Sequence, residues 1–167
     1  MQRLLVPLDG SPLAELALPS AVELAAKLDG DIILVRVVST PSPFLSYASD
    51  LLERIEELQG QDATAYLDKL AERLRDEGAR VQTRVVTGTV VHTINHLAKS
   101  EACDMIVMTS HGYGGLGFHI FGSIAQKLLH SASVPILVVR ASGDAAVREE
   151  ESEEAATDRA LLRKLRD

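Results

Sequence analysis

The run of residues 32–38, which reads IILVRVV, constrains the fold of this chain more than any other stretch of its sequence. Because nearly every position is apolar, a strand formed from this run would bury both of its faces. Strands of this kind are typical of parallel sheets that are covered by helices on both sides. We therefore expect an α/β fold built on a parallel sheet.

Four other apolar runs predict further strands, and stretches with helical periodicity separate all of them. These runs are residues 4–8, 81–86, 105–108 and 136–139. Residues 81–86 alternate between apolar and polar positions, which favours a more exposed strand at a sheet edge. The alternation of strands with helices indicates right-handed crossovers and a doubly wound parallel sheet of five strands.

Two of the intervening helices contain residues that could distort them. Ser11 is a suitable N-cap for the first helix, which continues to Gly30, and Pro19 falls near its start. The second helix covers residues 51–74, and Gly60 marks a position where it could break. The sequence predicts both helices but leaves their continuity open.

The length of 167 residues suits one domain followed by a tail. The composition changes after Arg140, so we place the domain at residues 1–141 and a charged tail at residues 142–167. Acidic residues come first in the tail and basic residues come last, an order that complements a helix dipole. We expect a helical tail outside the domain, which is either solvated or docks on another surface.

Charge and composition argue against several classes of protein. The net charge of −7 argues against general binding to nucleic acid phosphates. No stretch approaches the ~20 apolar residues that cross a membrane, and the first residues lack the long apolar segment of a signal peptide. The single cysteine, Cys103, cannot form a disulfide within the chain. These features predict a cytoplasmic protein.

Polar groups and glycine follow both the first and the fourth predicted strands. The first strand leads into Pro7, Leu8, Asp9 and Gly10, and the fourth leads into Thr109, Ser110, His111 and Gly112. In open parallel sheets, ligands bind beyond the C-terminal ends of the strands, where the strand order reverses. We expect the first and fourth strands to flank that point, and a binding site to lie between their ends.

The segment from His111 to Ser123 contains five glycines, placed between a predicted strand and a predicted helix. Glycines allow backbone N–H groups to approach a phosphate closely, although a structural turn would account for two of them. Gly122 and Ser123 open the helix, whose free N–H groups and dipole favour an anion. The segment is neither a Walker A loop nor a Rossmann fingerprint, because it lacks Gly-Lys-Ser/Thr and follows the fourth strand. It predicts a phosphate site of another type.

Three stretches of the chain resemble the universal stress protein family, over about residues 2–140. They are residues 5–11 (LVPLDGS), residues 105–112 (MIVMTSHG), and Gly122 and Ser123 followed by residues 134–139 (VPILVV). The family's nucleotide pattern is glycine, two residues, glycine, nine residues, glycine, then serine or threonine. Gly112, Gly122 and Ser123 fit this pattern, and Thr109 stands where its first glycine would be.

The resemblance implies a fold, a ligand and an assembly. The fold is adenine nucleotide alpha hydrolase-like, with a five-stranded sheet in the order 3-2-1-4-5 and, in this chain, a C-terminal helical tail. The ligand is ATP, with AMP or ADP as alternatives, together with Mg²⁺. Members of the family usually form homodimers, often through the fifth strand.

The resemblance also implies a set of nucleotide-binding residues. Asp9 and Val37 would face the adenine and the ribose, Pro7 would shape the wall, and Met108 and His111 would line the nucleoside. The glycines and the start of the following helix would hold the phosphates. The full set is Pro7, Asp9, Val37, Met108, Thr109, His111, Gly112, Gly122, Ser123 and Ile124.

The function implied is regulatory, in adaptation to stress, with at most slow ATP hydrolysis. The sequence places no second carboxylate beside Asp9, so no catalytic set is evident. The alternative is a partner-docking module of the same fold that has lost the nucleotide. Thr109 favours it, as do Tyr113 and Phe118, which stand where family members often carry basic residues.

A metal site is the other candidate that the sequence offers. His92 and His96 are spaced i, i+4 on a predicted helix, a spacing that can bind zinc. No third ligand is evident nearby in the sequence. We therefore expect two solvated histidines and no metal site.

Overall fold

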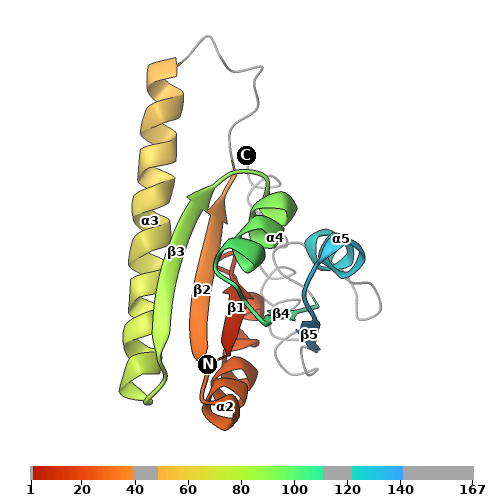
Figure 1. The fold of residues 1–167 in the computed structure, drawn as a ribbon. Coiled ribbons are helices and arrows are strands. Elements are labelled where there is room, and N and C mark those ends of the chain that lie inside the picture. Colours follow the sequence, from red (N-terminus) through yellow and green to blue (C-terminus); the bar gives the residue numbers. More distant parts are fainter. Residues whose placement is uncertain (1, 40–48, 111–121, 141–167) are drawn as a thin grey trace, which may run out of the picture.

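Five parallel strands alternate with helices in the structure of this protein, a computed structural model that describes residues 2–39, 49–110 and 122–140 (Figure 1). The strands are β1 (Arg3–Pro7), β2 (Asp31–Val38), β3 (Val81–Thr87), β4 (Met105–Thr109) and β5 (Ile136–Val139). The helices are α1 (Pro12–Glu15), α2 (Leu18–Leu28), α3 (Ser49–Asp76), α4 (Val90–Ser100) and α5 (Ser123–Ser131). All five predicted strands are present, and the predicted tail lies outside the described residues.

The strand order is β3-β2-β1-β4-β5, which confirms the expected doubly wound topology. β1 lies at the centre, with Pro7 opposite Val35 of β2 and Leu4 opposite Met105 of β4. The predicted edge position of β3 is also confirmed. Because all neighbouring strands run parallel, their C-terminal ends lie together on one side of the sheet, here called the carboxyl edge, and their N-terminal ends lie on the opposite side, here called the amino edge. These two sides are distinct from the edge strands of the sheet. The ends of β1 and β4 are therefore neighbours at the carboxyl edge.

Two hydrophobic clusters fill the space between the sheet and its helices, one on each face. Successive residues of β2 alternate between them: Leu34 packs with α2 and α3, and Ile33 and Val35 pack with α4 and α5. These three side chains are fully buried. Burial of a side chain of this size stabilises the fold by about 1.5–3 kcal/mol. The two-sided burial explains why the sequence of β2 is apolar along most of its length.

The first predicted helix is split into α1 and α2. Ser11 caps α1, and its Oγ accepts a hydrogen bond from the Ala14 N–H at 3.1 Å. Pro19 lies in the first turn of α2. A proline ring clashes with the carbonyl four residues earlier, here that of Glu15, so one continuous helix cannot pass through this point. The chain closes α1 with a tighter turn, in which the Ala17 N–H donates to the Ala14 carbonyl at 3.3 Å.

Helix α3 runs without a break through Gly60, so the structure settles the continuity that the sequence left open. The buried side chains of Leu67, Leu70 and Leu74 hold the helix against the sheet. A Cβ atom added to Gly60 would have no heavy atom within 4 Å, so glycine has no steric role at this position. None of the helices in the described ranges combines the length and apolar character needed to cross a bilayer.

Charged side chains link the layers at the amino edge. The Arg80 guanidinium donates to Asp31 Oδ1 at 2.7 Å and to Asp29 Oδ1 at 2.9 Å. The Arg3 backbone N–H donates to Asp104 Oδ2 at 2.8 Å. These contacts join the start of β3 to the end of α2, and the start of β1 to the start of β4.

Candidate functional site

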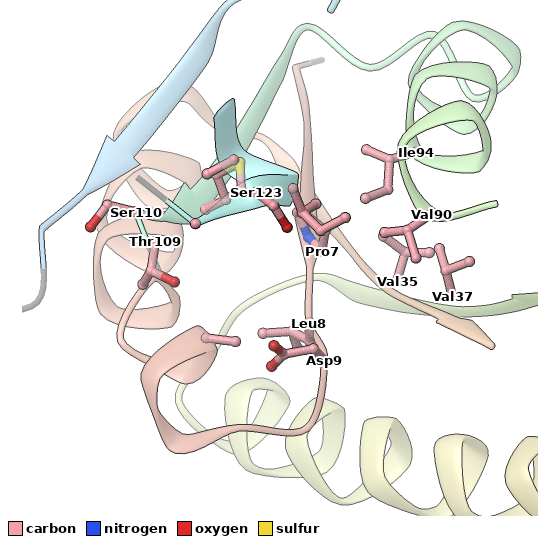
Figure 2. Close-up of a pocket in the computed structure, with 15 residues that line it drawn as sticks. Pro7, Leu8, Asp9, Val35, Val37, Val90, Ile94, Thr109, Ser110 and Ser123 are labelled. Carbon is pink, nitrogen blue, oxygen red and sulfur yellow. The ribbon is translucent and has the colours of Figure 1, made fainter. Parts of the chain in front are cut away.

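A cavity of about 180 Å³ opens at the carboxyl edge, between the ends of β1 and β4 (Figure 2). Figure 2 shows apolar side chains of β2 and α4 on one side of it, and Thr109 and Ser110 on the other. Among the described residues, the apolar part of the lining consists of Pro7, Leu8, Ala14, Val35, Val37, Val90, Ile94, Met108, Ile124 and Ala125. The other described residues of the lining are Asp9, Thr109, Ser110, Gly122 and Ser123. This arrangement suits a ligand with an apolar, flat part and a polar part.

The turn that follows β1 presents Asp9 to the cavity. The Leu8 N–H donates to the Val35 carbonyl at 2.8 Å, which extends the pairing of β1 with β2 by one residue. Beyond it, the Ser11 N–H and Ser11 Oγ–H donate to Asp9 Oδ1 at 2.9 and 2.6 Å. Because Ser11 is also the N-cap of α1, the same side chain fixes both the Asp9 carboxylate and the start of the helix.

The N-terminus of α5 forms another part of the wall, next to the end of β4. The Ser110 N–H donates to the Val139 carbonyl at 3.2 Å, and the Gly122 N–H donates to the Ser110 carbonyl at 2.8 Å. Gly122 is the N-cap of α5, and glycine has no side chain with which to cap the helix. The N–H groups in the first turn of a helix lack partners within the helix, and the dipole makes this end positive. The wall beside Ser123 is therefore suited to an anion.

Most of the residues predicted from sequence lie together in this cavity. Pro7, Asp9, Val37, Met108, Thr109, Gly122, Ser123 and Ile124 all line it. The predicted residues His111 and Gly112 lie outside the described residues, as do Tyr113 and Phe118. The structure thus brings the exits of β1 and β4 to one cavity, as the strand order requires.

Several lining residues were not predicted from sequence. Val90 and Ile94 belong to α4, which follows β3 and so also starts at the carboxyl edge. Their helical spacing was visible in the sequence, but which face of α4 meets the cavity depends on tertiary packing. Ser110 directly follows the predicted Thr109 and could have been included by position alone.

The cavity is small, and its wall includes Thr109, a residue that is only 5% exposed. The cavity volume of about 180 Å³ is smaller than the roughly 300–1,000 Å³ of typical pockets for drug-sized ligands. It therefore matches a part of a nucleotide, such as its base, better than a whole one.

The two groups that could carry metal or thiol chemistry lie elsewhere. His92 and His96 are both exposed on α4, with ring centroids 6.4 Å apart. Within the part of the chain that the structure describes, no group of three or more His, Cys, Asp or Glu side chains is placed to hold a metal ion. Cys103 is buried just before β4, and burial raises the pKa of its thiol to about 11.

Comparison with known proteins identifies the family. The sequence model of the universal stress protein family matches residues 1–140. The chain belongs to the universal stress protein family. One relative of this universal stress protein is MJ0531 of Methanocaldococcus jannaschii, which is 28% identical over 143 residues, with 83% of this chain and 82% of the relative covered.

Solved structures share the fold of this universal stress protein. The structure of M. jannaschii MJ0577 matches with a TM-score of 0.76 and 24% identity, covering 86% of this chain and 98% of that one. A universal stress protein in complex with cAMP has a TM-score of 0.64 at 20% identity, covering 84% and 98%. One from Archaeoglobus fulgidus in complex with dAMP has a TM-score of 0.58 at 20% identity, covering 83% and 97%. At these identities the likeness shows the adenine nucleotide alpha hydrolase-like fold.

Proposed function

We propose that this universal stress protein binds an adenine nucleotide in the cavity at the carboxyl edge and acts as a regulatory protein. ATP is the nucleotide that we expect first. The observation that carries the proposal is the N-terminus of α5, which has a glycine at its N-cap and adjoins a largely apolar cavity. An apolar wall suits a purine base, and a helix N-terminus suits phosphates. The cAMP and dAMP complexes of related folds support the choice of an adenine nucleotide.

The polar groups of the cavity suggest how the nucleotide lies in it. The base would contact Val37 and Met108, and the ribose hydroxyls would donate to Asp9. The phosphates would then meet the backbone N–H groups of Ser123 and Ile124 and the Ser123 hydroxyl. A Mg²⁺ ion would come with the phosphates, because this ion is usually held by phosphate oxygens and one or two carboxylates. Of the described residues that line the cavity, Asp9 alone has a carboxylate.

The hydrogen bonds of the Asp9 carboxylate favour a role in binding over a role in catalysis. Asp9 Oδ1 already accepts two hydrogen bonds from Ser11, which suits a fixed hydrogen-bond acceptor better than a base that must move a proton. We therefore propose slow ATP hydrolysis at most. The free thiol of Cys103 is compatible with a reducing compartment, and together with the sequence features described above it supports our proposal of a cytoplasmic location.

A partner-docking module without nucleotide is the second candidate. The buried Thr109 side chain and the small volume of the cavity favour it, because both reduce the space for a ligand. The two candidates differ in one measurable property, the affinity of the cavity for nucleotide.

Calorimetric titration of nucleotide-free protein with ATP, ADP and AMP tests the proposal, with and without Mg²⁺. GTP serves as the control for recognition of the base. We expect saturable binding of at least one adenine nucleotide, and weaker binding of GTP. Absence of heat and of a thermal shift at millimolar concentrations of all three adenine nucleotides would reject the first candidate and leave the second.

We also propose a homodimer that forms through β5. This edge strand consists of Ile136, Leu137, Val138 and Val139, and the Leu137 side chain is 37% exposed. The opposite edge strand, β3, carries Gln82 and Arg84 instead, as protected edges commonly do. An exposed apolar edge strand favours pairing with a second copy.

Light scattering at micromolar concentration tests the dimer with two matched variants. Leu137→Lys places a charge on β5 and is expected to give a monomer mass. Gln82→Lys places the same charge on β3 and should leave the dimer mass unchanged. A monomer mass for the unaltered protein, or a dimer that survives Leu137→Lys, would reject the β5 interface.

A further inference from the structure

Arg36 lies on the face of the sheet opposite the cavity. Its neighbours on β2, Val35 and Val37, line the cavity, and the alternation of a strand directs Arg36 the other way. The Arg36 guanidinium carbon lies 5.2 Å from the centroid of the Tyr66 ring of α3, a cation–π contact. The ion pairs formed among the described residues do not include Arg36.

The Arg36 guanidinium also lies close to Gly10. A Cβ atom added to Gly10 would collide with Arg36 Nη1, and it would lie 3.0 Å from the guanidinium carbon. Gly10 has φ of +87°, a conformation that side chains with a Cβ rarely adopt. Arg36 therefore lies against both the Tyr66 ring and the backbone of the turn that follows β1.

This turn is the one that holds Asp9 at the cavity. Asp9 precedes Gly10, and Asp9 Oδ1 accepts hydrogen bonds from the N–H and the Oγ–H of Ser11, which follows it. Helix α3 also supports the end of α1, because the hydroxyl of Tyr66 in α3 donates a hydrogen bond to Glu15 Oε1 at 3.1 Å.

Tyr66 shows that these groups share one electrostatic environment. Burial and the neighbouring Glu15 carboxylate raise the pKa of Tyr66 above its ordinary value, while the Arg36 charge lowers it and the Asp9 charge raises it. The hydroxyl of Tyr66 therefore senses the charges of both Arg36 and Asp9.

We propose that Arg36 is a positioning residue, which holds the turn at Gly10 so that the Asp9 carboxylate faces the ribose of a bound nucleotide. The inference rests on the proposed function for its ligand, but the support of the turn is a property of the protein alone. Arg36 acts from behind the turn, through Gly10 and Asp9, and it sets how strongly the site distinguishes a ribose from a sugar without hydroxyls.

The first test compares two ligands. Arg36→Met keeps the length of the side chain and removes its charge. We expect it to weaken ATP binding about tenfold, the loss that corresponds to one hydrogen bond with a charged group. Binding of 2′,3′-dideoxy-ATP should change less than about twofold, because that ligand has no hydroxyl to donate. Equal weakening for both ligands would overturn the inference, since it would indicate only a general distortion.

The second test asks whether Arg36 acts through Asp9. In an Asp9→Ala background, Arg36→Met should cause no further loss of ATP affinity, because residues that act through one contact are not additive. Arg84→Met is the matched control, since Arg84 is half-buried but pairs with Glu101 far from the turn. It should leave the preference for ATP over dideoxy-ATP unchanged. Additive losses from Asp9→Ala and Arg36→Met would reject the role of Arg36.

A third measurement needs no nucleotide. Amide hydrogen exchange of Ser11 and Ala14 reports on the turn, because these N–H groups donate to Asp9 Oδ1 and to Ser11 Oγ. We expect faster exchange at both in Arg36→Met and near-normal exchange in Arg36→Lys, which keeps the charge. Unchanged exchange in Arg36→Met would overturn the inference even if nucleotide binds. Faster exchange in a protein that binds no nucleotide would reject the proposed function and support the role of Arg36 in the turn.

Discussion

The two edges of the sheet have cavities of similar size but use their polar groups differently. The amino-edge cavity, about 210 Å³, is lined in part by Ala25 and Arg80, and the carboxyl-edge cavity is about 180 Å³. Arg80 is already held by Asp29 and Asp31 of the same chain. At the carboxyl edge, the N-cap of α5 is Gly122, which has no side chain to cap the helix. The two cavities therefore differ in the polar groups at their walls and not in their volume.

A parallel sheet gives this difference a physical origin. All helices that follow its strands start at the carboxyl edge, so their positive N-termini gather there. The amino edge collects helix C-termini, which here are joined to strand starts by ion pairs such as that of Arg80 with Asp31. Exposed pairs of this kind contribute little to stability, about 0–1 kcal/mol at most. We therefore expect changes at the carboxyl edge to weaken nucleotide binding, and changes at the amino edge to cause small losses of stability.

The largest expected effect follows from Gly122→Val at the carboxyl edge. A valine side chain at the N-cap of α5 would occupy space that the phosphates need. Gly122 has φ of −54° and ψ of 151°, which valine also adopts, so the backbone should not be strained. We expect calorimetry to show a loss of ATP affinity of at least about a hundredfold, roughly 3 kcal/mol. The value of Tm should change by less than about 5 °C.

Unchanged ATP affinity in a folded Gly122→Val variant would show that the phosphates lie away from α5. The proposed difference between the two edges would then be rejected.

The reactivity of Cys103 provides a second test at the amino edge. Burial, followed by the charge of Glu101, raises the pKa of Cys103 to about 11. Because the thiolate is the reactive form, two units of pKa correspond to about a hundredfold slower labelling at pH 8 in the folded protein than in the unfolded chain. Labelling with a thiol reagent, with and without denaturant, measures this ratio. Similar rates in the two states would show that the amino edge opens readily.

The same thiol predicts a pH dependence with a definite sign. The folded state keeps the Cys103 proton up to about pH 11, while the unfolded chain releases it near its ordinary pKa. The free energy of unfolding contributed by Cys103 is therefore fully present below the unfolded pKa and is lost as the pH rises through the folded pKa. Urea unfolding of Cys103→Ser should show a shallower decrease over this alkaline range than the unaltered protein. An identical decrease would assign it to other groups.

A smaller effect is expected from Arg80→Met, the amino-edge counterpart of Gly122→Val. The change removes the contacts with Asp29 and Asp31, but the Arg80 and Asp29 side chains are both well exposed to solvent. We expect Tm to decrease by no more than about 5 °C. The ATP affinity measured by calorimetry should remain unchanged. A loss of affinity comparable with that of Gly122→Val would mean that the two edges are not independent.

The smallest effect is expected from Gly60→Ala, a control for glycine replacement away from both edges. Alanine is the better helix former, and its Cβ would meet no neighbour within 4 Å. We expect stabilisation of about 0.5–1 kcal/mol, observed as a small increase in the urea midpoint, with no change in ATP affinity. A decrease in stability would indicate that α3 bends at Gly60.

The sequence was sufficient for much of the fold because its signals are local. The apolar run of β2 indicates burial on both faces of the strand, and the mixed apolar and polar pattern of β3 indicates an edge strand. Asp9 and Gly122 stand at the ends of predicted elements, and these positions were enough to predict that both residues would line one cavity. Rules for parallel sheets supply that step, because strand order determines which ends are neighbours.

Other features depended on contacts between segments far apart in the chain. Pro19 indicated a distortion, but only the structure shows that the helix divides into α1 and α2. Helix α3 continues through Gly60, since one glycine in a helix interior costs only about 1 kcal/mol and the local preference of a single residue does not decide where a long helix ends.

The placement of Arg36 is the clearest case of a feature that only the tertiary structure decided. In the sequence it is one polar residue in an apolar run, with no sign of a partner. In the fold it lies between Gly10, from the turn after β1, and Tyr66, from the middle of α3. Local sequence determines which strands and helices form, because periodicity and turn residues act over a few positions. Which side chains meet across layers depends on the register and packing of whole elements, and no local pattern encodes that.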